Sequence, residues 1–293
     1  MFDFKALYLA KTVAEACQLL AEHPEARIIA GGSDVLISSR EGKLPDVELV
    51  SIYDLDELRG VSLEEDGSLR IGSLTSFSQL YADPLIKEHV PVLGEAANMV
   101  GGPQVRNIGT VGGNTCNGVT SADTGASFLA HDTVIELQSR EGRRLVPMRE
   151  FYLGAHKVDI RPGELQTALI IRPESYRGYY GYYFKYAMRE AMDIATCACS
   201  VNVKLTADKR QFDDVRIAYG VAAAVPIRSP QAEAAARGSA VDRAQIAQIA
   251  KAGLTDIKPR SSWRATADFR THISEELLKR CLTEAARRAG AEI

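Results

Sequence analysis

Two glycine-rich segments carry the residues of this chain that could bind a phosphate-bearing ligand. The first, Gly31-Gly32-Ser33-Asp34, follows the apolar run Ile28-Ile29-Ala30 and precedes Val35-Leu36-Ile37, which reads as the opening of a helix. Adjacent glycines let the backbone approach a ligand closely, and successive N–H groups at a helix start bind anions such as pyrophosphate. A plain tight turn explains the same residues, so this segment alone leaves both interpretations open.

The second segment runs from Gly101 to Asp123 and is dense in Gly, Asn, Thr and Ser without hydrophobic periodicity. A structureless stretch of this length is uncommon inside a compact domain and is usually functional. Thr110, Asn114 and Asn117 offer hydroxyl and amide groups beside free backbone N–H groups, and Asp123 could accept a hydrogen bond from a ligand hydroxyl. The alternative interpretation is a solvated surface loop. The chain has neither a GxGxxG fingerprint nor a P-loop.

Hydrophobic spacing and turn residues divide the chain near 173–177. Residues 1–175 read as one mixed α/β unit, and residues 176–293 read as three strands followed by helices. The first helix begins at a possible capping box formed by Thr12 and Glu15. In the first unit we expect helices at about 13–20, 76–81 and 91–99, hairpins at 61–71 and 134–146, and a strand at 165–171. In the second we expect strands at 179–186, 201–205 and 215–219, and helices at 230–236, 241–253 and 274–288.

Composition excludes several classes of protein. With 35 Lys and Arg against 38 Asp and Glu, the formal charge of −3 is too balanced for an electrostatic nucleic-acid surface. No apolar run spans a bilayer, and residues 1–5 lack the pattern of a signal peptide, so we expect a cytoplasmic protein without a membrane partner. The five cysteines and five histidines are scattered, which predicts reduced thiols and no metal site.

The two glycine segments resemble those of a known family, the FAD-binding subunits of molybdenum hydroxylases. AGGSDVL (30–36) and NIGTVGGNTCNGVTSAD (107–123) are similar to the segments that hold FAD there. The run FKYAMR (184–189) with DIA (193–195), and RSSWRA (260–265) with FR (269–270), are similar to signatures of the same family in the second half of the chain. Within the family the chain is most similar to the bacterial xanthine dehydrogenase type. Gly118–Asp123 lacks the proline that this loop often has, which leaves its local shape open.

The resemblance implies an α+β fold of the p-cresol methylhydroxylase type. Two α/β subdomains, divided near residue 56, would form an FAD-binding domain over 1–175, followed by a C-terminal domain over 176–293 with a three-stranded antiparallel sheet and helices. Carried over position by position, the residues that would contact FAD are Ile28, Ile29, Ala30, Gly31, Gly32, Ser33, Asp34, Gly109, Thr110, Val111, Gly112, Gly113, Asn114, Asn117, Asp123, Leu165 and Lys185. Of these, Leu165 and Lys185 would lie on the flavin side. Trp263 could pack on a partner subunit or in the core.

The function implied by the resemblance is that of an oxidoreductase subunit. It would pass electrons from the clusters of a 2Fe–2S iron–sulfur subunit through FAD to NAD, while a molybdopterin-binding subunit hydroxylates the substrate. No catalytic acid–base pair or nucleophile is then needed in this chain, because a flavin carries its own redox chemistry. The alternatives are a self-contained FAD oxidoreductase of the same fold, the flavin subunit of an aldehyde, CO or N-heterocycle oxidising enzyme, and a non-catalytic nucleotide-binding protein.

Overall fold

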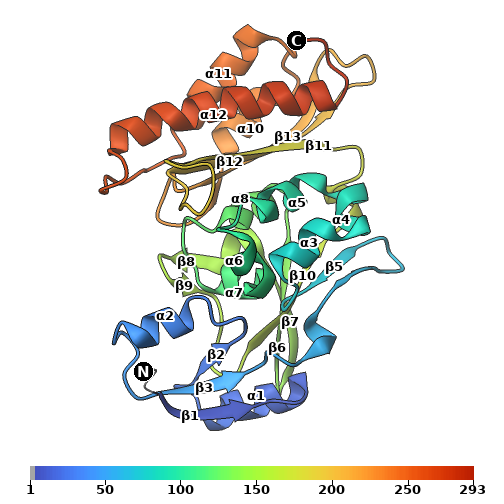
Figure 1. The fold of residues 1–293 in the computed structure, drawn as a ribbon. Coiled ribbons are helices and arrows are strands. Elements are labelled where there is room, and N and C mark those ends of the chain that lie inside the picture. Colours follow the sequence, from blue (N-terminus) through green and yellow to red (C-terminus); the bar gives the residue numbers. More distant parts are fainter. Residues whose placement is uncertain (1–3) are drawn as a thin grey trace.

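The computed structural model describes residues 4–293, so residues 1–3, on which the expectation of no signal peptide partly rests, lie outside it. The described chain forms three bodies stacked end to end, each built around its own main β-sheet (Figure 1). No helix between residues 4 and 293 is long and apolar enough to cross a membrane.

The amino-terminal body is a small parallel sheet with a helix on one face. Its strands lie in the order β1 (Phe4–Leu9), β3 (Val47–Ser51) and β2 (Arg27–Ile29). Helix α1 (Val13–Glu22) buries a stripe of Val13, Ala16, Cys17 and Leu20 against this sheet. The short helix α2 (Val35–Arg40) begins where the glycine segment after β2 ends.

The capping box predicted for α1 is only half formed. The Thr12 hydroxyl accepts a hydrogen bond from the Glu15 amide at 3.1 Å, as expected. The Glu15 carboxylate, however, accepts from the Lys11 amide at 2.8 Å rather than from Thr12. The helix therefore begins where the sequence predicts, with a slightly different set of partners.

The middle body is a five-stranded antiparallel sheet covered by short helices. The strand order is β4 (Val61–Leu63), β5 (Leu69–Gly72), β10 (Leu165–Ile171), β6 (Val134–Ser139) and β7 (Gly142–Pro147), so both predicted hairpins form. The helices are α3 (Phe77–Ala82), α4 (Pro84–His89), α5 (Pro91–Asn98), α6 (Pro103–Ile108), α7 (Val111–Cys116), α8 (Asp123–Ala130) and α9 (Met148–Phe151). The small hairpin of β8 (Tyr152–Gly154) and β9 (Lys157–Val158) and the 3₁₀ turns η1 (Asp56–Leu58) and η2 (Pro173–Ser175) complete it.

The expectation of a structureless stretch from Gly101 to Asp123 is wrong. Helices α6 and α7 occupy most of it, and α8 begins at its end. Pro103 starts α6, and the Thr110 hydroxyl caps α7 by accepting from the Gly113 amide at 3.1 Å. Each helix is only six residues long, too short for a hydrophobic repeat to show in the sequence.

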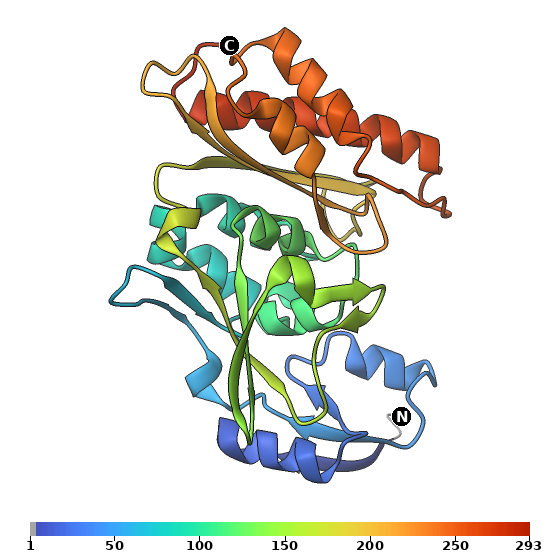
Figure 2. The ribbon, with the colours of Figure 1, turned by 180° about the vertical axis from the view of Figure 1, so that it is seen from behind.

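The carboxy-terminal body is an antiparallel sheet with helices on its outer face, as Figure 2 shows from behind. The sheet has four strands rather than the predicted three: β11 (Tyr180–Tyr186), β12 (Cys197–Leu205), β13 (Phe212–Gly220) and the two-residue β14 (Ile227–Arg228), which is too short to leave a sequence signal. Its helices are α10 (Pro230–Ala236), α11 (Arg243–Gly253) and α12 (Ala267–Arg288).

Helix α12 begins seven residues before the predicted position. Thr266 caps it by accepting from the Phe269 amide at 3.2 Å. Its first turns bury polar residues, Arg270 and Ser274, instead of apolar ones, and this hides the helical stripe there. Cys197, Cys199 and Cys281 lie in the core between α12 and the sheet.

Candidate functional site

The fold brings the two glycine segments into direct contact. A Cβ placed on Gly31 would lie 1.8 Å from the carbonyl oxygen of Ile108, at the end of α6. Only glycine fits at this crossing, because real Cβ atoms never approach an oxygen so closely. Gly32 follows with φ of +72°, a left-handed conformation that glycine adopts without strain.

The first segment offers unpaired donors. The backbone N–H groups of Gly31, Gly32, Ser33 and Asp34 have no acceptor among residues 4–293, and the Asp34 side chain does not cap α2. Consecutive free amides form a concave site for an anion such as a phosphate. The observation therefore favours the phosphate interpretation of this segment over a plain turn.

The second segment presents side chains rather than free amides, which corrects the expectation from sequence. The N–H groups of Gly109, Val111, Gly112, Gly113 and Asn114 all donate within the chain. Gly113 and Asn114 donate to Thr110, the residue that caps α7. The other three amides donate to carbonyls of α6 and of the segment after β5.

The two glycines of α7 lack a side chain with different consequences. A Cβ on Gly112 would lie 2.6 Å from Cβ of Ser73, so Gly112 lets the helix pack against the segment that directly follows β5. A Cβ on Gly113 would meet only the Thr110 hydroxyl, at 3.0 Å, and otherwise open space. Gly113 therefore leaves a surface that a ligand could approach.

An ion pair joins the middle and carboxy-terminal bodies beside this segment. The Lys185 ammonium on β11 donates to the Asp123 carboxylate at 2.8 Å and to the Met99 carbonyl at 2.9 Å. Both side chains are less than a tenth exposed. Two residues that the sequence places 62 positions apart are thus brought together by packing of α8 against the sheet.

Burial dominates the electrostatics of the pair. Removal from water raises the pKa of Asp123 to about 6, against the opposing attraction of Lys185 and a hydrogen bond from the Tyr183 hydroxyl at 3.4 Å. At neutral pH the carboxylate is still ionised. Tyr183 lies two residues before Lys185 on the same face of β11, a period-two signal that sequence reasoning missed.

The remaining predicted residues divide into two groups. Asn114 accepts a hydrogen bond from the Thr124 hydroxyl at 2.9 Å, which joins α7 to α8 beside Asp123, and the Asn117 side chain has no partner among residues 4–293. Ile28 and Ala30 pack against the amino-terminal core together with Leu165, which is 2% exposed. Leu165 thus lies in the amino-terminal core rather than on an open surface.

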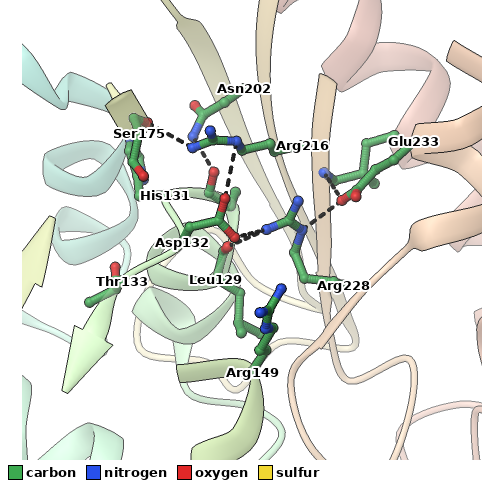
Figure 3. A network of polar contacts seen from close by, with 12 residues as sticks. Leu129, His131, Asp132, Thr133, Arg149, Ser175, Asn202, Arg216, Arg228 and Glu233 are labelled. Carbon is green, nitrogen blue, oxygen red and sulfur yellow. Dashed lines mark hydrogen bonds and ion pairs between the residues drawn. The ribbon is translucent and has the colours of Figure 1, made fainter. Parts of the chain in front are cut away.

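A second polar cluster, which we call the α8 clamp, fixes the other end of α8 (Figure 3). Arg228 of β14 forms an ion pair with Asp132 and donates to the Leu129 carbonyl at 3.0 Å. Arg216 of β13 reaches the same Asp132 carboxylate at 3.2 Å. The carboxy-terminal body therefore holds α8 at both its start and its end.

Comparison with known protein families identifies the family to which this architecture belongs. Residues 2–173 match the family described as FAD binding domain in molybdopterin dehydrogenase, and residues 182–285 match the CO dehydrogenase flavoprotein C-terminal domain. The chain belongs to this FAD-binding family of molybdenum enzymes. The family fold confirms the expected α+β class, an FAD-binding unit followed by an antiparallel-sheet domain, and it makes FAD the cofactor of this flavoprotein.

Individual relatives cover the whole chain. The xanthine dehydrogenase FAD-binding subunit of Escherichia coli O157:H7 is 42% identical over 293 residues, which is all of both chains. The carbon monoxide dehydrogenase medium chain of Hydrogenophaga pseudoflava is 29% identical and covers 94% of each chain. A solved carbon monoxide dehydrogenase structure from the same organism superimposes with a TM-score of 0.93 over 99% of this chain and 100% of the other, at 28% identity.

The residues present fit FAD. Four unpaired amides at Gly31–Asp34 suit a pyrophosphate, and the open side of Gly113 is a surface that a Cβ would fill. The buried Asp123–Lys185 pair adds one acceptor and one cation at the junction of the two bodies. Among residues 4–293 no cluster of three or more His, Cys, Asp or Glu could hold a metal ion.

Proposed function

We propose that this chain is the FAD-carrying electron-transfer subunit of a xanthine dehydrogenase-type molybdenum hydroxylase. In this complex it takes electrons from the clusters of a 2Fe–2S iron–sulfur subunit and passes them to NAD, while a molybdopterin-binding subunit hydroxylates the substrate. The observation that carries the proposal is the 42% identity over the full length to a xanthine dehydrogenase FAD-binding subunit, against 29% to a carbon monoxide dehydrogenase medium chain.

Each part of the site has a role in holding FAD. The free amides of Gly31–Asp34 would bind the diphosphate, and Thr110, Gly113 and Asn114 would line the space beside it. Asp123 would accept a hydrogen bond from the ribityl chain, and Lys185 would supply a positive charge on the flavin side that favours a reduced, negatively charged ring system. FAD supplies two-electron chemistry with a nicotinamide and single-electron exchange with metal clusters. The protein binds, orients and electrically tunes it.

The thiols support a cytoplasmic location for this complex. All five cysteines, Cys17, Cys116, Cys197, Cys199 and Cys281, are free, and four of them are buried. Reduced, unpaired cysteines are typical of a reducing compartment. The proposal therefore has the chain working in the cytoplasm.

The test uses the purified chain with FAD. We expect one FAD per chain, released on denaturation, and electron transfer from NADH to an artificial acceptor. Lys185→Ala is expected to keep FAD and lose most of this activity, whereas Lys204→Ala, at an exposed position of β12, leaves it unchanged. Release of FMN instead of FAD, or full activity in Lys185→Ala, contradicts the proposed site.

A further inference from the structure

A basic segment that the FAD site does not use lies before and at the start of α12. Between residues 258 and 270 it holds four basic residues, Lys258, Arg260, Arg264 and Arg270, and a single acidic one, in a chain whose formal charge is −3. It also holds Trp263, the only tryptophan, which is 77% exposed, so of the two alternatives that the sequence left open, packing in the core is excluded. The Arg264 guanidinium lies over the indole ring, 4.1 Å from its centroid.

These cations lack carboxylate partners. Within residues 4–293 none of the four forms an ion pair, whereas 11 of the other 21 arginines do. The Nε atoms of Arg264 and Arg270 are buried without any acceptor. Desolvation, together with repulsion from Arg260 and Arg264, lowers the pKa of Arg270. Arg270 itself is buried, so the cations that this segment offers to a partner are the exposed Lys258 and Arg260 and the half-buried Arg264.

The basic segment is continuous with the end of the sheet that carries Lys185. Arg270 donates to the Thr196 carbonyl, and the Thr196 amide donates to the Tyr186 carbonyl at 2.7 Å. The Phe269 and Tyr186 rings lie 5.9 Å apart. In Figure 1 the coil before α12 and the loop between β11 and β12 lie at the same end of the sheet. That loop exposes Met188 at 63%, which adds apolar area to the basic surface.

We propose that Trp263 and the basic segment 258–270 dock an acidic surface of the iron–sulfur subunit. Tryptophan and arginine are the residues that carry most binding energy at interfaces, and the absence of internal carboxylates selects a partner of negative charge. The iron–sulfur subunit is the occupant because hydrogen bonds connect Arg270 through Thr196 to Tyr186, the chain neighbour of Lys185. A partner bound at this surface would therefore bring its clusters toward the flavin side. This inference rests on the proposed function, which supplies the partner.

The experiment measures binding of the FAD-loaded chain to the purified iron–sulfur subunit of the same organism by calorimetry. The test variant combines Trp263→Ala with Arg260→Glu, two exposed positions that the fold does not need. The matched control combines Tyr180→Ala, at the opposite end of β11, with Arg243→Glu at the start of α11. We expect the test variant to raise Kd about 100-fold, the loss typical of an interface hot spot, and the control to leave it within about threefold. Added salt weakens wild-type binding, because charge attraction is screened.

Equal affinity of the test variant and the wild type overturns the proposed surface. Binding of the wild type to the molybdopterin-binding subunit alone, lost in the same variant, overturns the proposed occupant and assigns the surface to that subunit. The FAD content and the NADH:acceptor activity of the isolated variant are expected to equal those of the wild type. If the wild-type chain lacks both, the proposed function fails, whatever the binding measurement shows about this surface.

Discussion

Two glycines of this chain meet different requirements, one of folding and the other of binding. Gly31 is fixed by the fold, because a Cβ there would lie 1.8 Å from the Ile108 carbonyl oxygen. Gly113 is not, since a Cβ there would meet only the Thr110 hydroxyl, at 3.0 Å. The same residue type therefore serves two different purposes, and substitution can distinguish them.

We expect Gly113→Val to fold and to lose FAD. The added side chain enters the open space beside α7 that the cofactor would occupy, while β-branching and the loss of glycine change helix propensity little. Flavin absorbance after gel filtration measures retention, and circular dichroism checks the fold. Gly31→Ala serves as the contrasting variant, expected to lose both FAD and stability. Full FAD content in Gly113→Val would show that the second segment does not line the cofactor.

The buried carboxyl of Asp123 predicts a pH-dependent stability. Its pKa is about 6 in the folded chain, above the ordinary value of 3.8, so between these values the folded state binds a proton more tightly than the unfolded state. The stability that this carboxyl contributes is present below about pH 4 and is lost as the pH rises through about 6. Asp123→Asn removes that dependence.

The measurement compares urea unfolding of the wild-type and Asp123→Asn chains without FAD. The free energy of unfolding of the wild type minus that of the variant should fall as the pH rises from about 4 to about 6. His131, whose pKa burial lowers to about 4, titrates in both proteins and cancels in this difference. A difference that stays constant or rises over this range would mean that Asp123 is not a buried carboxyl of raised pKa.

At the scale of elements, α8 connects the cofactor site with the interface between two bodies. All eight of its residues are buried, and it packs against β12 and β13. Its first residue pairs with Lys185, while its last carbonyls accept from Arg228 and from the Asn202 amide. Cations at a helix C-terminus also interact favourably with its dipole. Because α8 is held at both ends, the α8 clamp at its end also helps to fix the position of Asp123 at its start.

We expect Asp132→Asn to loosen the α8 clamp. Asn tolerates the left-handed backbone of this position (φ +47°), so the substitution removes charge without adding strain. Loss of the ion pairs to Arg216 and Arg228 should lower the free energy of unfolding by about 1 to 2 kcal/mol, and Tm by a few degrees. Differential scanning calorimetry measures the change. Asp213→Asn, whose exposed ion pair to Lys204 spans 3.7 Å, is the control and should be neutral.

For the whole molecule, the proposed FAD site draws on all three stacked bodies. The amino-terminal body supplies the glycine segment after β2, the middle body supplies α7 and Asp123, and the carboxy-terminal body supplies Lys185. None of them offers a metal cluster among residues 4–293. The proposed function assigns electron transfer through FAD to this chain and the hydroxylation of the substrate to the molybdopterin-binding subunit.

The isolated, FAD-loaded chain should therefore not oxidise xanthine. Supplied with xanthine and NAD, it is expected to form neither urate nor NADH, both of which are followed by absorbance. The complex reconstituted with its molybdopterin-binding and iron–sulfur subunits is expected to form both. Xanthine turnover by a preparation free of partners and molybdenum would contradict the proposed role as an electron-transfer subunit.

The sequence by itself determined much of this protein's organisation. The face of α1, the hairpins β4–β5 and β6–β7, and the strand β10 all follow from local periodicity and turn residues. The family follows from the two glycine motifs together with the signatures after residue 184. These features are local, and a few consecutive residues are enough to encode them.

Only the tertiary structure decided how distant residues meet. The contact of Gly31 with Ile108 and the ion pair of Asp123 with Lys185 depend on packing between segments far apart in the chain. Helices α6 and α7 were missed because six residues are too few for a periodic signal, and their caps stabilise them instead. The exposure of Trp263 was likewise undecided, because an aromatic side chain has the same sequence signal in a core and at an interface, and only its neighbours in space distinguish the two.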